Sequence, residues 1–136
     1  MILEAAREDA RGRLEQFLAG RGLSGLLAGG ERRSFEDQRA MMLGVIADEL
    51  ARSYARVDAA LGLAVIGDPA GIPILRRVFD ERMFAITNSG NERGAAALAL
   101  ALLDDLASIE RVRGVARINL SASFVDLALA ILERRA

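Results

Sequence analysis

Hydrophobic residues recur along most of the chain at the three- and four-residue spacing of helices. In residues 3–19 the apolar positions form one helical stripe, made of Leu3, Ala6, Ala10, Leu14 and Phe17. The charged residues lie off this stripe, so the pattern predicts an amphipathic helix. Gly20 and Gly22 follow its last turn and should end it.

The two segments that follow differ in how clearly they are patterned. Residues 20–33 contain five glycines and should be turn-like, although Leu23, Leu26 and Leu27 leave open one buried helical turn. From Ser34 to Ile66 the apolar stripe continues without a Gly-Pro breaker, which predicts either one long helix or two helices broken near Arg52 and Ser53. The positions of this stripe are Met42, Ile46, Leu50, Tyr54, Val57, Leu61 and Ala64.

The second half of the chain alternates turns and helices. Gly67, Asp68 and Pro69 form a turn, and Asp68 can cap the next helix. Pro73 must lie in the first turn of that helix, because deeper in it would break a backbone hydrogen bond. We therefore expect that helix to begin at 70–72 and to extend to 79, or as far as 86. Beyond a loop at 87–91, helices are expected at 92–103, at 106–118, and from a cap at Ser121 or Ser123 to Arg134.

Composition supports an all-α fold in a single domain. Ala and Leu dominate a 52% hydrophobic content, aromatic residues make up 4%, and only two prolines are present in 136 residues. These residues favour helices, whereas the β-branched and aromatic residues that favour strands are sparse. The length is that of one domain with one core.

Missing residue types narrow the possible chemistry. The chain has no Cys and no His, so it has neither thiolate ligands nor the commonest general base and metal ligand. It also has no Lys, so all 18 basic residues are Arg. We expect no cofactor and no catalytic site.

The charge and the apolar runs bear on partners and location. The net charge is −1, which makes nucleic acid an improbable partner because its binding proteins normally carry excess positive charge. The longest apolar run, 95–103, is too short to span a bilayer. No basic segment precedes an apolar one at the N-terminus, so no signal peptide is expected and a cytoplasmic location is the default.

A shift of 37 residues places two segments of the chain over one another. Residues 61–68 (LGLAVIGD) align with 98–105 (LALALLDD), and beyond the turn Ala70, Ile72 and Arg76 align with Ala107, Ile109 and Arg113. Each copy consists of a helix, an acidic turn and a second helix. A period of this length is typical of an α-solenoid, in which each helix pair buries its apolar face against the next pair.

Residues 59–75 (AALGLAVIGDPAGIPIL) resemble a HEAT-like repeat of the phycobilisome-lyase type. Those repeats typically have an Ala-rich helix, Leu-Gly, Ile-Gly-Asp-Pro, and a second helix that opens with an apolar residue, Pro and Leu. The resemblance covers about 25 residues, is weaker over the second copy, and does not reach residues 1–36. It implies scaffolding or binding rather than a reaction.

The sequence departs from this repeat pattern at one position. The family often has an Arg seven residues before the Leu of Leu-Gly, where this chain has Tyr54 and, in the second copy, Asn91. Arg56 and Arg93 follow two residues later. The departure puts the usual Arg–Asp ladder between successive repeats in question.

Three motifs of catalytic type have simpler explanations. Residues 20–25 (GRGLSG) match the dinucleotide pattern GxGxxG, but a helix and not a strand precedes them. Residues 22–26 (GLSGL) lack the last Gly of a nucleophile elbow, and the chain has no His to activate Ser24. Adjacent carboxylates such as Asp104 and Asp105 do not face one another on a helix.

The sequence thus predicts one domain over residues 1–136, with an irregular N-terminal cap region at 1–33 and HEAT-like repeats at 34–136. The predicted fold is an all-α solenoid of helix pairs. The leading function is a non-catalytic protein–protein interaction adaptor or small structural subunit. The alternative is a binding module for a small anionic or apolar ligand in the helical groove.

Candidate partner-binding residues lie on the second helices of the two copies: Arg76, Arg77, Arg113 and Arg117. They suit the carboxylates of an acidic partner, because each Arg can make a bidentate contact. The simpler alternative is a solvated face whose arginines pair with nearby Asp80, Glu81 and Glu110.

Self-association is also expected. The last predicted helix is broadly apolar, with Phe124, Leu127, Leu129, Ile131 and Leu132. Short solenoids leave apolar faces open at their ends unless these are capped. We therefore expect a homo-oligomer or a stable partner protein.

Overall fold

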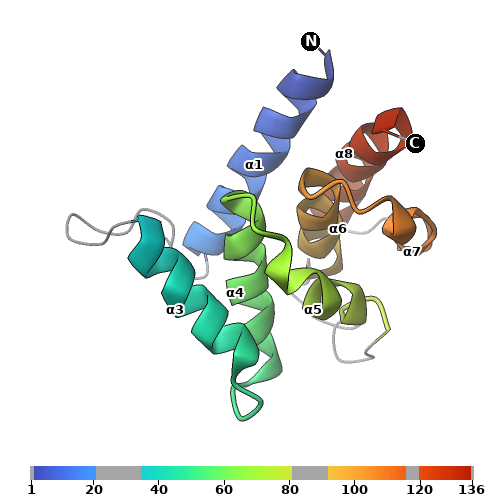
Figure 1. Cartoon of the computed structure of the whole chain (residues 1–136). Coiled ribbons are helices and arrows are strands. Elements are labelled where there is room, and N and C mark those ends of the chain that lie inside the picture. The colour runs from blue at the N-terminus through green and yellow to red at the C-terminus, as the bar shows by residue number, and fades with distance from the viewer. Residues whose placement is uncertain (1, 21–34, 81–91, 116–119, 136) are drawn as a thin grey trace.

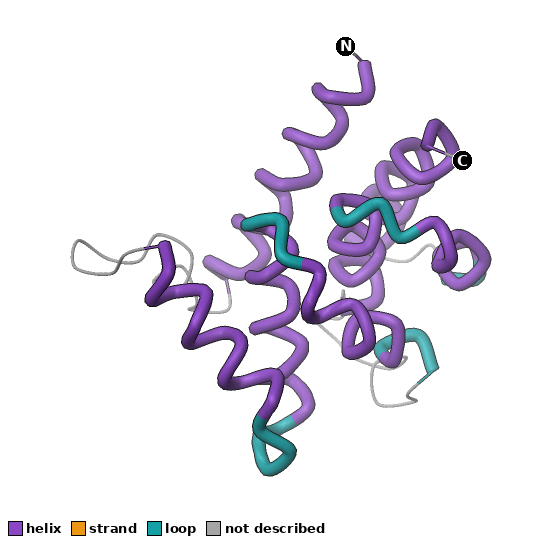
Figure 2. The backbone as a smooth tube through the Cα atoms, in the orientation of Figure 1, coloured by secondary structure: helices purple, strands orange, loops and turns teal. Residues whose placement is uncertain are grey.

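The computed structural model describes residues 2–20, 35–80, 92–115 and 120–135. Within these ranges all the regular structure is helical, and Figure 2 shows no strand there. The all-α prediction is therefore confirmed. Several sequence-based expectations fall outside the described residues: the turn-like stretch from 21 to 33, the loop at 87–91, Glu81 and Arg117.

Seven α-helices and two short 3-10 turns make up the described chain. They are α1 (Ile2–Gly20), α3 (Phe35–Ala47), α4 (Ser53–Val65), η2 (Pro69–Gly71), α5 (Ile72–Arg77), α6 (Glu92–Leu102), η4 (Leu106–Ser108), α7 (Ile109–Arg113) and α8 (Leu120–Arg135).

The long apolar stripe between 35 and 66 forms two helices, α3 and α4. They are separated by a turn at residues 48–52, next to the predicted break at Arg52 and Ser53. The Asp48 carboxylate accepts a hydrogen bond from the Leu50 amide at 2.9 Å. This local bond gives the backbone an alternative to continuing the helix, as Asp side chains often do at turns.

The 37-residue repeat extends to the hydrogen bonds of the backbone. At the end of α4, the Gly67 and Asp68 amides donate to the carbonyls of Ala64 and Leu63. At the end of α6, the amides of residues 104 and 105 donate in the same way to the carbonyls of residues 101 and 100. Each set is a Schellman cap, which places one residue in the left-handed region.

The left-handed residue differs between the two caps. Gly67 has φ 83° and Asp104, its equivalent in the second copy, has φ 56°. Glycine takes this conformation without a steric penalty, and Asp is among the few other residues that tolerate it. Both copies therefore make the same turn with different residues.

The second helices are shorter than predicted. Pro73 lies in the first turn of α5, as expected, but the helix ends at Arg77 and is followed by a turn through Asp80. In the other copy, α7 ends at Arg113 and Gly114 caps it. The 3-10 turns η2 and η4 take the place of the first residues of each expected helix. The α-helical part is therefore shorter at its N-terminal end too.

The helices form two layers, and α1 covers one of them (Figure 1). The first helices of the pairs, α4 and α6, lie together with α8, and α1 contacts all three. The second helices, α3, α5 and α7, follow one another on the opposite side of this layer. We call α3, α5 and α7, with their leading turns η2 and η4, the second-helix layer.

The position of the α4–α6–α8 layer explains why its helices are so apolar. In α6, every residue from Gly94 to Leu102 is buried. A helix that is hydrophobic around its whole circumference needs neighbours on all sides. α1 supplies them on one side through Ala10, Leu14 and Leu18, each at most 1% exposed.

The last helix does not present the open apolar face expected from its sequence. Phe124, Ile131 and Leu132 are buried, and Leu127 and Leu129 are half-buried. They pack against α6, α1 and α7, whereas exposed positions of α8 include Asp126 and Glu133. The sequence could not distinguish an open end from a helix enclosed by α1. Helix α1 crosses the α4–α6–α8 layer and does not form a pair with α3. The arrangement of the helix pairs as an extended solenoid therefore stays a prediction.

Candidate protein-interaction surface

An arginine ladder connects successive helix pairs. Arg76 of α5 donates from Nε and Nη2 to the two carboxylate oxygens of Asp105, at 2.9 and 2.6 Å. Thirty-seven residues earlier, Arg39 of α3 donates to Asp68. Each Arg lies on a second helix and reaches the acidic turn of the following pair. An Arg–Asp ladder is therefore present, formed by Arg39 and Arg76 and not at the positions of Tyr54 and Asn91.

The aspartates of the ladder also organise their own turns. Asp68 accepts a hydrogen bond from the Ala70 amide at 2.9 Å and so caps η2, as predicted. Asp105 accepts from the Ser108 hydroxyl at 2.5 Å. Their side chains are only 10% and 9% exposed. Nearly buried carboxylates need such partners, because water no longer solvates them.

These contacts lower the pKa of both aspartates. Burial raises the pKa of the Asp68 carboxyl, but the hydrogen bonds from Ala70 and Arg39 outweigh it, so the pKa lies below its ordinary value. The hydrogen bond from Arg76 is the main cause that lowers the pKa of Asp105; burial opposes it, and the Ser108 hydroxyl supports it. Both side chains are charged at neutral pH.

A second set of arginines binds the carboxyl ends of helices. Arg56 donates to the Ile46 carbonyl at 3.2 and 2.6 Å, near the end of α3. Its equivalent, Arg93, donates to the carbonyls of Val78 and Phe79 beyond α5, at 3.1 and 2.9 Å. The last carbonyls of a helix have no partner within it and carry partial negative charge, which a guanidinium satisfies.

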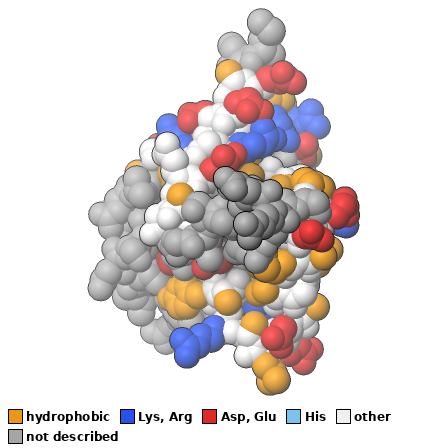
Figure 3. Space-filling model, turned by 90° about the vertical axis from the view of Figure 1, so that its left-hand side faces the viewer, with side chains coloured by type: hydrophobic (Ala, Val, Ile, Leu, Met, Phe, Trp, Pro, Cys, Tyr) orange, Lys and Arg blue, Asp and Glu red, His pale blue; other side chains and the backbone are white. Residues whose placement is uncertain are grey.

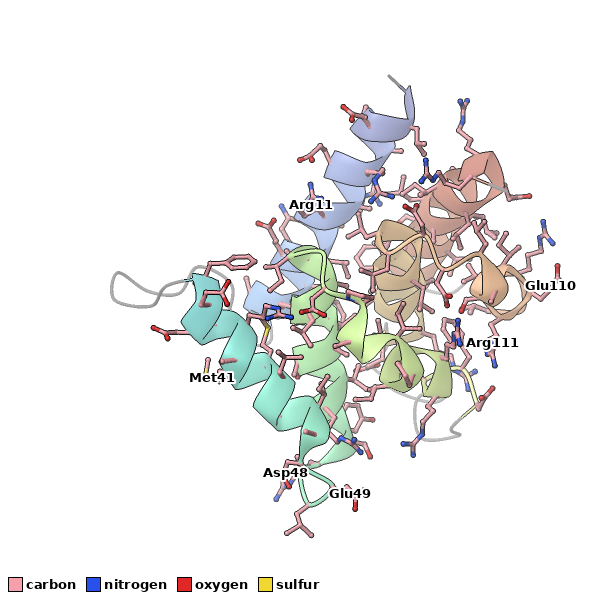
Figure 4. The ribbon with its side chains drawn as sticks, viewed as in Figure 1. Arg11, Met41, Asp48, Glu49, Glu110 and Arg111 are labelled. Carbon is pink, nitrogen blue, oxygen red and sulfur yellow. The ribbon has the colours of Figure 1, made fainter. Side chains whose placement is uncertain are left out.

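Two arginines of α1 do the same for the other layer. Arg7 donates to the Leu102 carbonyl at 2.7 Å and to Asp104 at 2.9 Å, at the end of α6. Arg11 donates to the Val65 carbonyl at 3.3 Å, at the end of α4. Figure 4 shows Arg11 on α1. Val65 and Leu102 are equivalent under the 37-residue shift. Helix α1 therefore binds the same position of both copies of the repeat, through Arg11 and Arg7.

The structure describes three of the four candidate partner-binding arginines, and their environments differ. Arg76 is held by Asp105 in the ladder. Arg77 is exposed on α5. Arg113 is 47% exposed and pairs with Glu110 and, at 3.2 Å, with Glu133 of α8. The pairing with Glu110 is the one that the simpler alternative gives for Arg113, and both glutamates raise the pKa of Arg113. Arg117 lies outside the described residues.

Sequence reasoning missed where apolar side chains are exposed. Phe35 is 53% exposed, Leu106 40% and Leu50 95%, and these are the large hydrophobic residues exposed within the described ranges. Phe35 begins α3, Leu106 begins η4, and Leu50 lies in the turn after α3. All three belong to the second-helix layer or to the turn next to it. Their places depend on which helix faces are covered, which the periodicity alone does not give.

An open groove lies between α1 and α8. It has a volume of about 440 Å³ and is lined by Asp9, Arg13, Gln16, Phe17, Ser123 and Phe124. The rings of Phe17 and Phe124 meet edge to face, with centroids 6.4 Å apart. Arg13 pairs with Asp9 at 3.0 Å on its rim. The described residues contain no cluster of three potential metal-ligating side chains, and none of the helices described is long and apolar enough to cross a membrane.

Comparison with known families identifies part of this architecture. The family model of the PBS lyase HEAT-like repeat matches residues 55–81, which comprise most of α4, η2 and α5. Residues 55–81 are a HEAT-like repeat. No curated protein and no solved structure matches the chain.

The match of this family model confirms the resemblance to a HEAT-like repeat that residues 59–75 show in the sequence. The matched segment includes Asp68 and Arg76, one residue from each of the two rungs of the ladder. The 37-residue shift carries the same helix–turn–helix arrangement to residues 92–113, through the second Schellman cap and η4. A helical-repeat architecture of this kind is often used in protein interaction.

Proposed function

We propose that this protein is a non-catalytic interaction module, an adaptor or a small structural subunit, that binds another protein through its second-helix layer. The observation that carries the proposal is that Phe35, Leu50 and Leu106, the large hydrophobic residues exposed within the described ranges, all belong to this layer or to the turn beside it. Exposed large apolar side chains are a feature of many protein-binding surfaces. The α4–α6–α8 layer is already covered by α1.

Arginines at the far edge of the layer would contribute charge to such an interface. Arg77 is exposed on α5, and Arg111 and Arg113 are exposed on α7; Figure 4 labels Arg111 there. Arg113 pairs with glutamates that are themselves well exposed, Glu110 at 83% and Glu133 at 51%. Pairs of this kind are weak and can be exchanged for a partner's carboxylates. Arg76 contributes less directly, because the Nε and Nη2 of its guanidinium already donate to Asp105.

The test is affinity capture from the native host with identification by mass spectrometry. Three baits are compared: the natural chain, Leu106→Glu in the second-helix layer, and Ala130→Glu on the exposed side of α8. We expect a protein that the natural chain and Ala130→Glu capture equally and that Leu106→Glu loses. Capture that survives the combined Leu106→Glu, Arg77→Glu and Arg113→Glu changes would place the interaction outside the second-helix layer.

A second candidate function rests on the groove between α1 and α8. Its size suits a small molecule, and Phe17 with Phe124 offers an aromatic wall beside the polar Gln16 and Ser123. We rank it below protein binding, because the groove is open and its arginine is paired. Small molecules are screened for those that raise the melting temperature of the natural chain. A ligand bound in this groove should raise the melting temperature of Phe124→Ala less, whereas a ligand bound elsewhere should raise both equally.

A further inference from the structure

Many surface arginines of this molecule lie beside an acidic partner. On α1, Arg11 pairs with Glu8 and Arg13 pairs with Asp9. Figure 3 views the molecule from the side on which α1 lies, and acidic and basic side chains adjoin one another in its upper part. Each pair of this kind cancels its own charge at the surface.

Arg111 of α7 is exposed and differs from these arginines. Among the residues that the structure describes, no hydrogen bond or ion pair engages its guanidinium. The preceding residue, Glu110, lies on another side of α7 (Figure 4) and pairs with Arg113. The five N–H donors of an arginine side chain are therefore all open to water or to a ligand at Arg111.

Arg111 brings a second positive charge to an ion pair that is already complete. Its charge helps to lower the pKa of the Asp105 carboxyl, although the hydrogen bond from Arg76 is the main cause. Asp105 is 9% exposed, and its two oxygens already accept from Arg76 and Ser108. One carboxylate thus lies near two guanidiniums, and the charge of Arg111 is in excess.

The other copy of the repeat shows that the fold does not require an arginine at this position. The 37-residue shift places Arg111 over Ile74 of α5, which is half-buried and packs against the hydrophobic core. The next residues, Val112 and Leu75, correspond as expected, and both are buried. Only the second copy therefore has an exposed charge where the repeat accommodates an apolar side chain. Departures of this kind from a structural pattern are typical of functional positions.

Apolar side chains are exposed next to Arg111. Leu106 is 40% exposed, and Ala107 beside it is exposed as well. Ala107 precedes Arg111 by four residues, a spacing that brings side chains together on a helix surface. In the first copy the place of Leu106 is taken by Pro69, so the turn does not require a leucine either. We call Leu106, Ala107 and Arg111 the η4–α7 face.

We propose that the η4–α7 face binds an acidic segment of another protein, in which a glutamate or aspartate binds Arg111 and a neighbouring apolar side chain packs on Leu106. This inference deepens the proposed function and rests on it. A guanidinium and a carboxylate can form two parallel hydrogen bonds, which give direction as well as binding free energy. The contact with Leu106 removes apolar surface of both partners from water.

Nucleic acid is a poorer fit to the same face. A phosphate backbone presents many negative charges in a row, and proteins bind it with several cations together. Here the neighbouring Arg76 and Arg113 are bound to carboxylates, and Glu110 is 83% exposed on the same helix. A single unpaired guanidinium beside a leucine suits one carboxylate with an apolar neighbour.

The experiment selects short random peptides, displayed on phage, for binding to the natural chain. Peptides that also bind Arg111→Ile, which carries the residue of the first copy, are then removed. We expect the remaining peptides to share an aspartate or glutamate next to a leucine, isoleucine or phenylalanine. Their sequences are determined, and one of them is synthesised with a fluorescein label.

Fluorescence polarisation then measures the affinity of this peptide for each variant. Arg111→Ile and Leu106→Glu should each weaken its binding by about tenfold or more at low salt. The effect of Arg111→Ile should shrink at high salt, where exposed charges are screened. Arg111→Glu should abolish binding of the peptide and bind a second peptide that has lysine in place of the acidic residue.

Two controls separate binding from charge and from folding. Arg134→Ile makes the same substitution at an exposed position of α8 and should leave the affinity unchanged. Arg111→Ile should leave the urea midpoint of unfolding unchanged or raise it, because the fold accommodates isoleucine at the equivalent Ile74. A structural role of Arg111 would lower this midpoint instead.

Several outcomes would overturn the proposal. They are the recovery of no peptide that depends on Arg111, Arg111-dependent peptides without an acidic residue, and equal weakening by Arg134→Ile. A labelled oligonucleotide that binds in place of acidic peptides, and is lost with Arg111→Ile, would assign the face to nucleic acid.

The capture from the native host distinguishes this proposal from the broader proposed function. An Arg111→Ile bait is added to the three described above. A host protein that this bait retains and Leu106→Glu loses would keep the second-helix layer as the interaction surface and remove the acidic segment. A host protein that both variants retain would count against the proposed function itself.

Discussion

The ladder predicts a measurable coupling between Arg76 and Asp105. Two hydrogen bonds join the guanidinium to a carboxylate that is 9% exposed. Hydrogen bonds to charged groups contribute about 1.5–3 kcal/mol. Arg76 itself is 37% exposed, so water and salt screen part of the interaction. We expect a coupling free energy of about 1.5–2 kcal/mol.

The assay is a double-mutant cycle on the free energy of unfolding. Arg76→Met, Asp105→Asn and the double variant are unfolded in urea and followed by circular dichroism. With a urea dependence of about 2 kcal/mol per molar for a small domain, each single variant should unfold at a urea concentration roughly 1 M lower. The double variant should lose less than the sum of the two, since either change alone already breaks the pair.

Arg113 and Glu110 provide the matched control. They occupy an equivalent helix, but both side chains are well exposed, at 47% and 83%. Their cycle should give no measurable coupling. A coupling below about 0.5 kcal/mol for Arg76 and Asp105 would mean that this pair contributes little to holding the helix pairs together, and the ladder would lose its structural role.

Four further predictions follow from the same structure. Gly71→Ala should destabilise the fold by about 1–3 kcal/mol, because the added Cβ would lie 2.6 Å from the Cβ of Ala60; an unchanged urea midpoint would contradict this close approach. Gly44→Ala should stabilise α3 by up to about 1 kcal/mol, since its Cβ meets nothing; a lower melting temperature would refute this. Asp68→Ala should cost about 1 kcal/mol or more, because the cap of η2 and the bond from Arg39 are both lost; an unchanged midpoint would mean that another group caps this turn. The lowered pKa values of Asp68 and Asp105 contribute stability that is complete above about pH 4 and is lost as the pH falls below it; Asp105→Asn should reduce this acid sensitivity, as urea midpoints at pH 7 and pH 3 would show.

The repeat could be predicted from the sequence because its signals are local. The turn at Gly67, Asp68 and Pro69 combines a helix stop, a cap and a fixed φ within three residues. Aligning it with Asp104 and Asp105 placed both helix pairs correctly. The lengths of α5 and α7 were overestimated, because a 3-10 turn and an α-helix have similar sequence preferences.

The contacts between distant segments could not be predicted in the same way. Arg39 and Asp68 are 29 residues apart, as are Arg76 and Asp105, and no local pattern relates a residue of one pair to the turn of the next. Arg76 therefore counted as a surface candidate, although the fold turns it toward Asp105. The burial of α8 depends likewise on α1, more than a hundred residues away in sequence.

The way α1 is anchored has a consequence for the order in which the molecule assembles. Arg7 reaches carbonyls and a carboxylate 94 to 97 residues further along the chain. Synthesis proceeds from the N-terminus, so α1 leaves the ribosome long before α6 and α8 exist. Contacts across such a separation form late, because the chain must first lose the entropy of a long loop. During that interval the apolar stripe of α1 is exposed, so α1 is made before α6 and α8 but is among the last of these helices to be enclosed.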